Sequence, residues 1–211
     1  MSEPRTPPKV LRRRAERHDR ILACAARAFA ERGPEAVSLD ELAELAGVAK
    51  GTLYTHFPTK EALLVAIIEP ALRATERRLD ALTARTADAI VRELLQQWVE
   101  LWQRHPEALR LGHSPQAAAL GELRPLHRRV AGKLSAHLVR AARSGRLRGS
   151  AEWAAMALAR LGVPLLESFM PLDPSGAAFV EAVSALLLRP TSHTEPKPSA
   201  KKPAAPRRAQ R

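Results

Sequence analysis

The 211-residue sequence predicts an all-α protein of about nine helices, in which a small three-helix N-terminal domain precedes a larger helical domain. Two observations lead to this fold class. Aromatic residues make up only 4% of the chain, so leucine, alanine, valine and isoleucine must fill the core, and this mixture favours helices over sheets. Apolar residues also recur at helical spacing, and no stretch shows the strict alternation that is typical of a half-buried strand.

The first helix follows a proline-rich start. Residues 1–14 contain three prolines and a run of arginines, and we expect them to form a disordered basic arm. The helix after the arm ends at Gly33 and Pro34, because glycine stops a helix and proline cannot continue one. Its apolar face consists of Ile21, Leu22, Ala25, Ala26 and Phe29.

A short helix, a glycine turn and a second short helix come next. Ser38 and Glu41 form a capping box, in which the two side chains satisfy free backbone amides at the start of a helix. Ala43 and Gly47 follow four residues apart. A small residue at the first position lets two helices cross closely, and glycine at the second tolerates the left-handed backbone of a turn. The spacing predicts a helix-turn-helix between Ser38 and His56.

The remaining chain also has helical patterns. Thr59 caps a helix that runs from Lys60 into the low eighties, and Pro70 should kink or split this helix because proline removes one backbone hydrogen bond. Further helices are expected at 86–104, 107–111, 117–144, 151–170 and 174–189, with Pro125 an irregularity near the start of the third. The predicted organisation is a disordered basic arm (1–14), a helix-turn-helix domain (15–60), a larger helical domain (61–189) and a disordered basic tail (190–211).

The net charge of +12 is concentrated at the two ends of the chain. Residues 1–20 hold seven Lys or Arg against three acidic residues, and residues 190–211 hold six against one. Basic ends favour a polyanionic partner, of which nucleic acid is the commonest. A solvated tail that keeps the protein soluble fits the charge equally well.

The predicted helix from Ala49 to His56 has side chains that suit DNA recognition, with its N-terminal end towards base edges. Lys50 reaches a guanine edge or a phosphate, and Gly51 allows close approach. Lys60 places a cation beside the free amides of a helix start, which favours a phosphate. A plain helical hairpin is the alternative, but the capping box, the turn glycine and the basic second helix coincide here. The predicted DNA-binding residues are Ser38, Ala49, Lys50, Gly51, Thr52, Tyr54, His56, Thr59 and Lys60.

The stretch ILACAARAFAERG, followed by VSLDELAELAGVAKGTLYTHFPTKEALL, resembles the N-terminal domain of the TetR/AcrR family of regulators. The resemblance implies an all-helical homodimer, whose larger domain holds a ligand pocket and the dimer interface. Most members repress until a small-molecule effector releases them from the operator. One departure is Ala49, where the family often has Ser or Thr. Alanine cannot cap the recognition helix, and the missing cap costs roughly 1 kcal/mol of local stability. The family's usual DNA contacts fall on Lys50, Thr52, Tyr54, His56 and Lys60.

The larger domain is expected to hold a pocket for an effector of unknown identity. The candidate lining residues are Trp98, Trp102, Trp153, Met156 and Phe169, although each of them alone also fits an ordinary core position. The histidines between His105 and His137 lack the i, i+4 spacing of two metal ligands on one helical turn, so no metal or other cofactor is predicted. The sequence has no nucleophile beside a base and no phosphate-cradling glycine loop, which argues against an enzyme.

The last two predicted helices are apolar around most of their surfaces and need burial from more than one side. Packing against the same pair of a second copy supplies this burial, so we expect a homodimer. Its two recognition helices would lie about 34 Å apart, or a multiple of that, and would read double-stranded DNA at a near-palindromic operator. The alternatives are an architectural protein that coats DNA through its basic ends and a regulator that activates.

The sequence also predicts the compartment. Cys24 is the only cysteine, so no internal disulfide can form, and a reducing interior is expected. The longest apolar run, residues 62–68, is too short to span a membrane, and the first thirty residues lack the apolar stretch of a signal peptide. We therefore expect a soluble, cytoplasmic protein with no membrane partner.

Overall fold

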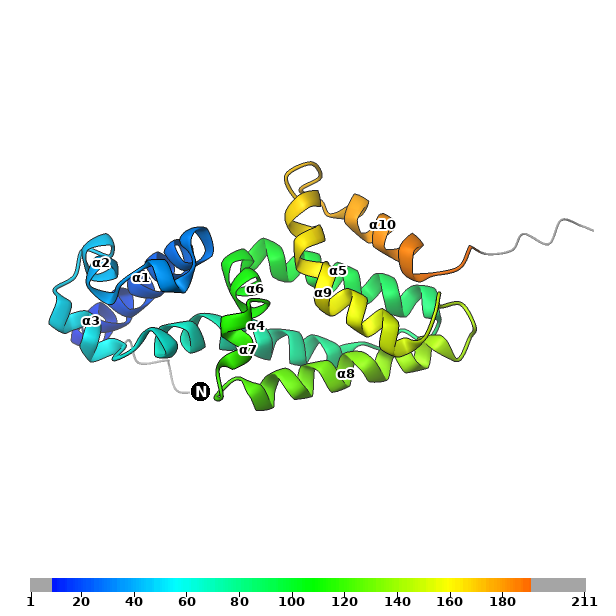
Figure 1. Cartoon of the computed structure of the whole chain (residues 1–211), viewed down its shortest axis with the longest axis horizontal. Helices are drawn as coiled ribbons and strands as arrows, with labels where there is room; N and C mark the ends of the chain where they lie inside the picture. Colours follow the sequence, from blue (N-terminus) through cyan, green and yellow to red (C-terminus); the bar gives the residue numbers. More distant parts are fainter. Residues whose placement is uncertain (1–8, 191–211) are drawn as a thin grey trace, which may run out of the picture.

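The computed structural model describes residues 9–190, which form ten α-helices, one short 3₁₀ helix and an isolated bridge between Leu147 and Leu188. The expected all-α fold, with a small N-terminal domain and a larger helical domain, is confirmed. The molecule is elongated, with the N-terminal helices at one end and the C-terminal helices at the other (Figure 1). No helix among the described residues has the length and apolar character needed to cross a membrane.

The N-terminal domain begins with the long helix α1 (Lys9–Arg32). It ends at Gly33, whose φ of 81° is left-handed, and the short 3₁₀ helix η1 (Pro34–Ala36) follows. The start of α1 corrects the expected disordered arm over residues 1–14, because residues 9–14 are helical. Arginine and leucine are good helix formers, and no proline follows Pro8 in this stretch. The rest of the arm (1–8) and the tail from residue 191 onwards lie outside the described residues.

The predicted helix-turn-helix is formed by α2 (Leu39–Leu45) and α3 (Lys50–His56). Gly47 lies between them with φ of 63°, in the left-handed region that glycine adopts most easily. Leu42 and Leu53 are fully buried and anchor one helix each in the N-terminal core. The sequence placed both helices and the turn correctly.

Helix α4 (Lys60–Ala81) connects the N-terminal helices to the larger domain. The expected split at Pro70 does not occur, because the helix continues through this residue, while the expected kink stays a prediction. Ile67, Ile68 and Ala71 are buried on both sides of the proline, so packing holds the two halves together although one backbone hydrogen bond is missing. Tertiary contacts therefore outweigh the local cost.

Four helices follow in the larger domain: α5 (Ala87–Arg104), α6 (Pro106–Gly112), α7 (Pro115–Ala119) and α8 (Arg124–Ala142). The prediction of one long helix over 117–144 is wrong, because a turn at residues 120–123 separates α7 from α8. Leu123 is only 2% exposed in the N-terminal core, and this burial fixes the turn. Pro125 lies in the first turn of α8, where its missing amide costs nothing.

The last two helices are α9 (Ala151–Phe169) and α10 (Ala177–Leu187), close to their predicted positions. Helix α10 begins three residues later than expected. The carboxylate of Asp173 accepts hydrogen bonds from the amides of Ser175 and Ala178, at 3.1 and 2.8 Å, and this local bonding holds residues 173–176 in a turn. In Figure 1, α9 and α10 lie at the end of the molecule opposite to α3.

The buried side chains form two hydrophobic cores. The larger-domain core joins the end of α4 to α5, α8, α9 and α10. The N-terminal core joins α1–α4 to α6 and α7, through residues that include Ala108, Leu111 and Ala117. The proposed domain boundary between residues 60 and 61 therefore does not separate the two cores. Helix α6 belongs to the larger domain by sequence, but it packs on α1 and α4.

Candidate nucleic-acid interface

The backbone of the helix-turn-helix is fixed by local hydrogen bonds. The hydroxyl of Ser38 accepts from the amide of Glu41 at 3.1 Å, which is one half of the predicted capping box. The side chain of Glu41 instead accepts from Arg32 at 2.6 Å, so it ties α2 to the end of α1. The amide of Val48 donates to the carbonyl of Ala43 at 3.0 Å and closes the turn. These bonds hold α3 at a fixed angle to α2.

The two ends of the motif are capped differently. Ala49 is the N-cap of α3 and makes no side-chain capping bond, as expected from its methyl group. Thr59 caps α4, where its hydroxyl accepts from the amide of Ala62 at 3.1 Å. The predicted DNA-binding residues Ser38 and Thr59 therefore both use their hydroxyls within the chain. Each keeps lone-pair and donor capacity, because a hydroxyl accepts twice and donates once.

The outer face of α3 is polar and accessible. Lys50, Gly51 and Tyr54 are exposed, whereas Thr52 and His56 are partly buried. The ammonium of Lys50 lies 2.7 Å from Oδ2 of Asp40, and the hydroxyl of Tyr54 donates to Oδ1 of the same carboxylate at 3.2 Å. The hydrogen bond from Lys50 lowers the pKa of Asp40, so this carboxylate is ionised at neutral pH.

Asp40 is the residue of this face that sequence reasoning missed. The apolar pattern identifies α2 as a support for α3, and it gives no reason to connect Asp40 with residues ten and fourteen positions later. The signal lies in the helix-turn-helix geometry itself, because Asp40 in the first turn of α2 lies beside Lys50 and Tyr54 of α3. An acidic residue in that turn is close to any cation that begins the second helix.

Lys60 is placed differently from the expectation. Its ammonium donates to the carbonyl of Pro34 at 3.0 Å in a partly buried position, so it connects the start of α4 to the turn after α1. A phosphate at the start of α4 would have to compete with this carbonyl for the ammonium. The predicted role of Lys60 as a phosphate contact remains a prediction, and its observed contact is structural.

His56 lies where α1 meets the end of α3. Its ring centroid is 5.9 Å from that of His18, and the ring of His18 lies 5.0 Å from that of Phe57. Burial lowers the pKa of His56, and the nearby His18, Arg14 and Arg17 lower it further. Arg14 and Arg17 of α1 therefore place positive charge near the end of α3.

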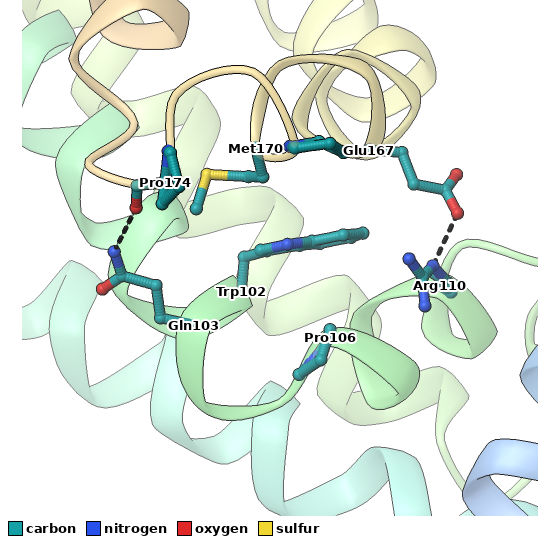
Figure 2. Close-up of a pocket in the computed structure, with 8 residues that line it drawn as sticks. Trp102, Gln103, Pro106, Arg110, Glu167, Met170 and Pro174 are labelled. Carbon is teal, nitrogen blue, oxygen red and sulfur yellow. Dashed lines mark hydrogen bonds and ion pairs between the residues drawn. The ribbon is translucent and has the colours of Figure 1, made fainter.

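A cavity of about 390 Å³ lies in the larger domain, between α5, α6 and the end of α9. Figure 2 shows the ring of Trp102 in its centre, with Met170 on one side and Pro106 on the other. The guanidinium of Arg110 lies 4.8 Å from the Trp102 ring centroid and donates to Glu167 at 2.5 Å. The lining residues are Trp102, Gln103, Pro106, Arg110, Glu167, Met170, Pro171 and Pro174.

Of the five predicted pocket residues, only Trp102 lines this cavity. Trp98 packs on α9, where its ring fills the space that a side chain at Gly162 would need. Phe169 packs edge-to-face on Phe179 in the core, with ring centroids 6.2 Å apart. The other two predicted residues, Trp153 and Met156, are 40% and 57% exposed on the outside of α9. Helical periodicity identifies apolar residues, but it does not show which apolar face meets a cavity.

A second, polar cavity of about 290 Å³ lies at the far end of the larger domain. Its arginines are mostly engaged within the chain: Arg92 with Glu181, and Arg146 with Asp88, at 2.9 and 2.7 Å. This cavity therefore holds an ion-pair network that fixes the end of the helical bundle. Among residues 9–190, no group of three or more His, Cys, Asp or Glu side chains is placed to hold a metal ion.

The fold and the site define a helix-turn-helix protein with a separate helical domain, and its N-terminal part is similar to known sequences. Residues 21–67 match the family model described as bacterial regulatory proteins, tetR family. The HTH-type transcriptional regulator EthR of Mycolicibacterium smegmatis is 32% identical over 100 residues, which cover 46% of this chain and 46% of that protein. RutR of Escherichia coli K12 is 35% identical over 92 residues, or 43% of each chain.

A third relative is described as a transcriptional activator. The HTH-type transcriptional activator FasR of M. smegmatis is 41% identical over 56 residues, or 26% of each chain. The chain spans less than half the length of these curated relatives.

Solved structures extend the likeness to the larger domain. The ketosteroid transcriptional regulator KstR2 of Mycobacterium tuberculosis has a TM-score of 0.69 at 19% identity, covering 82% of this chain and 96% of that chain. The TetR family regulator PfmR from Thermus thermophilus has a TM-score of 0.63 at 25% identity, covering 79% and 95%. The KstR2 likeness shows the fold alone. Together, the three comparisons support a TetR family transcriptional regulator, as the sequence resemblance implies.

Proposed function

We propose that this protein is a sequence-specific transcriptional regulator that binds a near-palindromic operator as a homodimer and is released by a small-molecule effector. The observation that carries the proposal is the exposed polar face of α3, with Lys50, Gly51 and Tyr54 accessible on a helix anchored by the buried Leu53. A rigid short helix with an accessible cation at its N-terminal end is suited to read base edges in the major groove.

The start of α1 supports the same interface. Its described residues carry several exposed arginines, and Arg14 and Arg17 lie near His56 at the end of α3. Arginines beside a recognition helix favour contacts to flanking phosphates, which supply affinity without reading sequence. Because this stretch is helical, we infer that its arginines follow the DNA backbone on a rigid element.

The larger domain supports a homodimer through its last two helices. Large apolar side chains are exposed at three positions of α9 and one position of α10, and burial against a second copy would remove them from water. Burying the same face of a second copy by a two-fold axis would cover these side chains and set the distance between two recognition helices. The exposed apolar residues of this face are Trp153, Met156, Leu161 and Leu186.

The cavity around Trp102 is our candidate effector site. It offers a flat aromatic ring, apolar contacts from Met170, and Arg110, whose ion pair with Glu167 is partly exposed. We infer that the effector combines a planar apolar part with an anionic group that competes with Glu167 for Arg110. Arg110 belongs to α6, which packs on α1 and α4, so a ligand that moves α6 also acts on the DNA-binding helices.

The test is selection of bound sequences from random DNA, with the full chain and with Lys50→Ala and Tyr54→Phe. We expect the wild type to enrich one near-palindromic motif, and both variants to lose or change it. Arg85→Ala is the matched control, because this exposed arginine lies in the loop between α4 and α5, away from α3. Failure of the wild type to enrich any motif would refute the proposal and would favour the architectural alternative, which the net charge of +12 supports.

We propose that the protein represses transcription. Activation is the alternative, because one relative is an activator. A reporter gene under the selected operator distinguishes the two. We expect reporter output to rise when the regulator is deleted, whereas a fall would assign activation.

A further inference from the structure

We propose that Asp40 is a specificity-determining residue of the DNA interface, because its carboxylate occupies Lys50 and Tyr54 and makes their use by non-cognate DNA costly. The inference rests on the proposed function. It concerns a residue that does not itself suit DNA binding, since a carboxylate repels the phosphate backbone.

The geometry gives each partner its own oxygen. Oδ2 of Asp40 lies 2.7 Å from Nζ of Lys50, and Oδ1 accepts from the hydroxyl of Tyr54 at 3.2 Å. Lys50 and Tyr54 are four residues apart on α3 and therefore share one face of the helix. One carboxylate from α2 thus holds both of the recognition side chains that extend from this face.

The contacts are accessible to competition. The side chains of Lys50 and Asp40 are 56% and 46% exposed, so a phosphate can reach the ammonium without unfolding the motif. Both partners are charged at neutral pH, because the hydrogen bond between them lowers the pKa of Asp40 and raises the pKa of Lys50. In the free protein, the N-terminal end of α3 therefore carries the Lys50–Asp40 ion pair, although the sequence of α3 alone predicts an unpaired lysine there.

This arrangement affects non-cognate and cognate DNA differently. On random DNA, Lys50 gains a phosphate only by giving up Asp40, and the freed carboxylate then lies near the backbone. The protein therefore neutralises about one phosphate fewer than it would if Lys50 were unpaired. On the operator, a base-edge contact by Lys50 and a contact by Tyr54 offset the lost pair. Asp40 therefore lowers non-specific affinity more than specific affinity.

The experiment compares Asp40→Asn with the wild type in the full chain, by binding to random-sequence DNA and to the selected operator over a salt series. We expect Asp40→Asn to bind random DNA about fivefold more tightly at physiological salt, with a salt slope steeper by about 0.9. Operator affinity should change by about twofold or less, so the specificity ratio falls severalfold. Asp40→Glu keeps the charge and should keep non-specific binding low.

Glu44→Gln is the matched control. Glu44 is also exposed on α2 and raises the pKa of Lys50 through space, but no ion pair of its side chain is found among the described residues, so it controls for a nearby charge that lacks the direct bond. Its substitution removes the same charge and should raise both affinities together, leaving the ratio unchanged. An Asp40→Asn variant that keeps the wild-type ratio, or that loses affinity for both DNAs, would overturn the proposal. Thermal unfolding of each variant confirms that it is folded.

The two proposals fail separately. If selection returns no motif, the regulator proposal fails, while the salt slopes on random DNA still compare Asp40→Asn with Glu44→Gln. Equal slopes for these two variants would refute the role of Asp40 whether or not an operator exists. A steeper slope for Asp40→Asn alone would support it.

Discussion

Gly162 shows how one residue position can fix the packing of two helices. It lies inside α9, where a Cβ would be only 1.7 Å from Cζ3 of Trp98 on α5. The absence of a side chain lets the large indole ring fit between the two helices. The tryptophan that the sequence suggests as a pocket residue is therefore a packing residue.

Gly162→Ala should destabilise the protein. The added methyl group displaces the Trp98 ring in a close-packed core, and such overpacking costs about 1–3 kcal/mol of the free energy of unfolding. Gly132→Ala on α8 is the matched control, since an added Cβ there meets no atom within 4 Å. Because alanine is the better helix former, the control should gain about 0.5–1 kcal/mol. Urea unfolding measures both, and two changes of the same sign would contradict the prediction.

We expect His56 to give folding and DNA binding opposite pH dependences. Burial lowers its pKa in the free protein, so the folded state favours neutral imidazole. The pKa of His56 in the folded state lies below the unfolded value of about 6.5. The neutral imidazole therefore stabilises the folded state above about pH 6.5. This contribution to the free energy of unfolding is lost as the pH falls through the folded-state pKa. Phosphates beside His56 in a DNA complex favour the charged imidazolium instead.

We therefore expect DNA affinity to rise by about threefold when the pH falls from about 7.5 to 6.0 at constant ionic strength. Over the same interval, the free energy of unfolding of the free protein should fall. His56→Asn should reduce the rise in affinity, measured by fluorescence anisotropy. His105→Asn replaces an exposed histidine at the end of α5 and should retain it. An unchanged rise in the His56 variant would show that other groups carry the effect.

At the scale of single elements, the helices with strong local signals were predictable. Ser38 and Thr59 form the expected caps, and Gly47 adopts the expected left-handed turn, because caps and turns are local in sequence. The break between α7 and α8 was missed because the burial of Leu123 in a distant core, and not a local signal, decides it. Pro125 indicates an irregularity near this boundary, and the structure places it in the first turn of α8.

The candidate site was predictable to the same extent. The polar residues of α3 follow from the motif, and Lys50 and Tyr54 are exposed, whereas Thr52 and His56 are partly buried. Their pairing with Asp40 and the carbonyl contact of Lys60 depend on how α2 and η1 lie against α3 and α4. Four of the five suggested pocket residues do not line the Trp102 cavity, because periodicity does not distinguish a core, a cavity and an outer surface.

The uncapped start of α3 gives a prediction for this element. Ala49→Ser should supply the missing N-cap and raise the free energy of unfolding by about 1 kcal/mol, because its hydroxyl can accept from a free amide. Ser38→Ala removes a cap that is present on α2 and should lower the same quantity by about 1 kcal/mol. Chemical denaturation measures both variants. If Ala49→Ser has no effect, the start of α3 is satisfied in another way.

At the scale of the whole molecule, the two cores meet through α4 and α6. Helix α4 contributes to both cores, and α6 belongs to the N-terminal core while its Arg110 reaches Glu167 on α9. In our proposal, these contacts are the route by which a ligand near Trp102 acts on the helix-turn-helix. The assembly of two copies would couple two such units, because α9 and α10 are also the proposed interface.

The dimer proposal gives a prediction for the whole molecule. Met156→Glu places a charge at an apolar position of α9 that is 57% exposed, where burial against a second copy would leave the charge unpaired. We expect the variant to sediment as a monomer. Its affinity for the full operator should fall by a factor of about 100 or more, because the second half-site is then no longer bound intramolecularly. Affinity for an isolated half-site should not change, since α3 lies at the other end of the molecule.

Val139→Glu is the matched control for this experiment. Val139 is 40% exposed on α8, outside the proposed interface, and Met156 is 57% exposed. The control introduces the same charge at a similarly accessible apolar position, so it should remain a dimer with unchanged operator affinity. If both variants dimerise, α9 is not in the interface. If both variants become monomers, the interface also includes α8. The distance between the two recognition helices would then not be set by α9 and α10 alone.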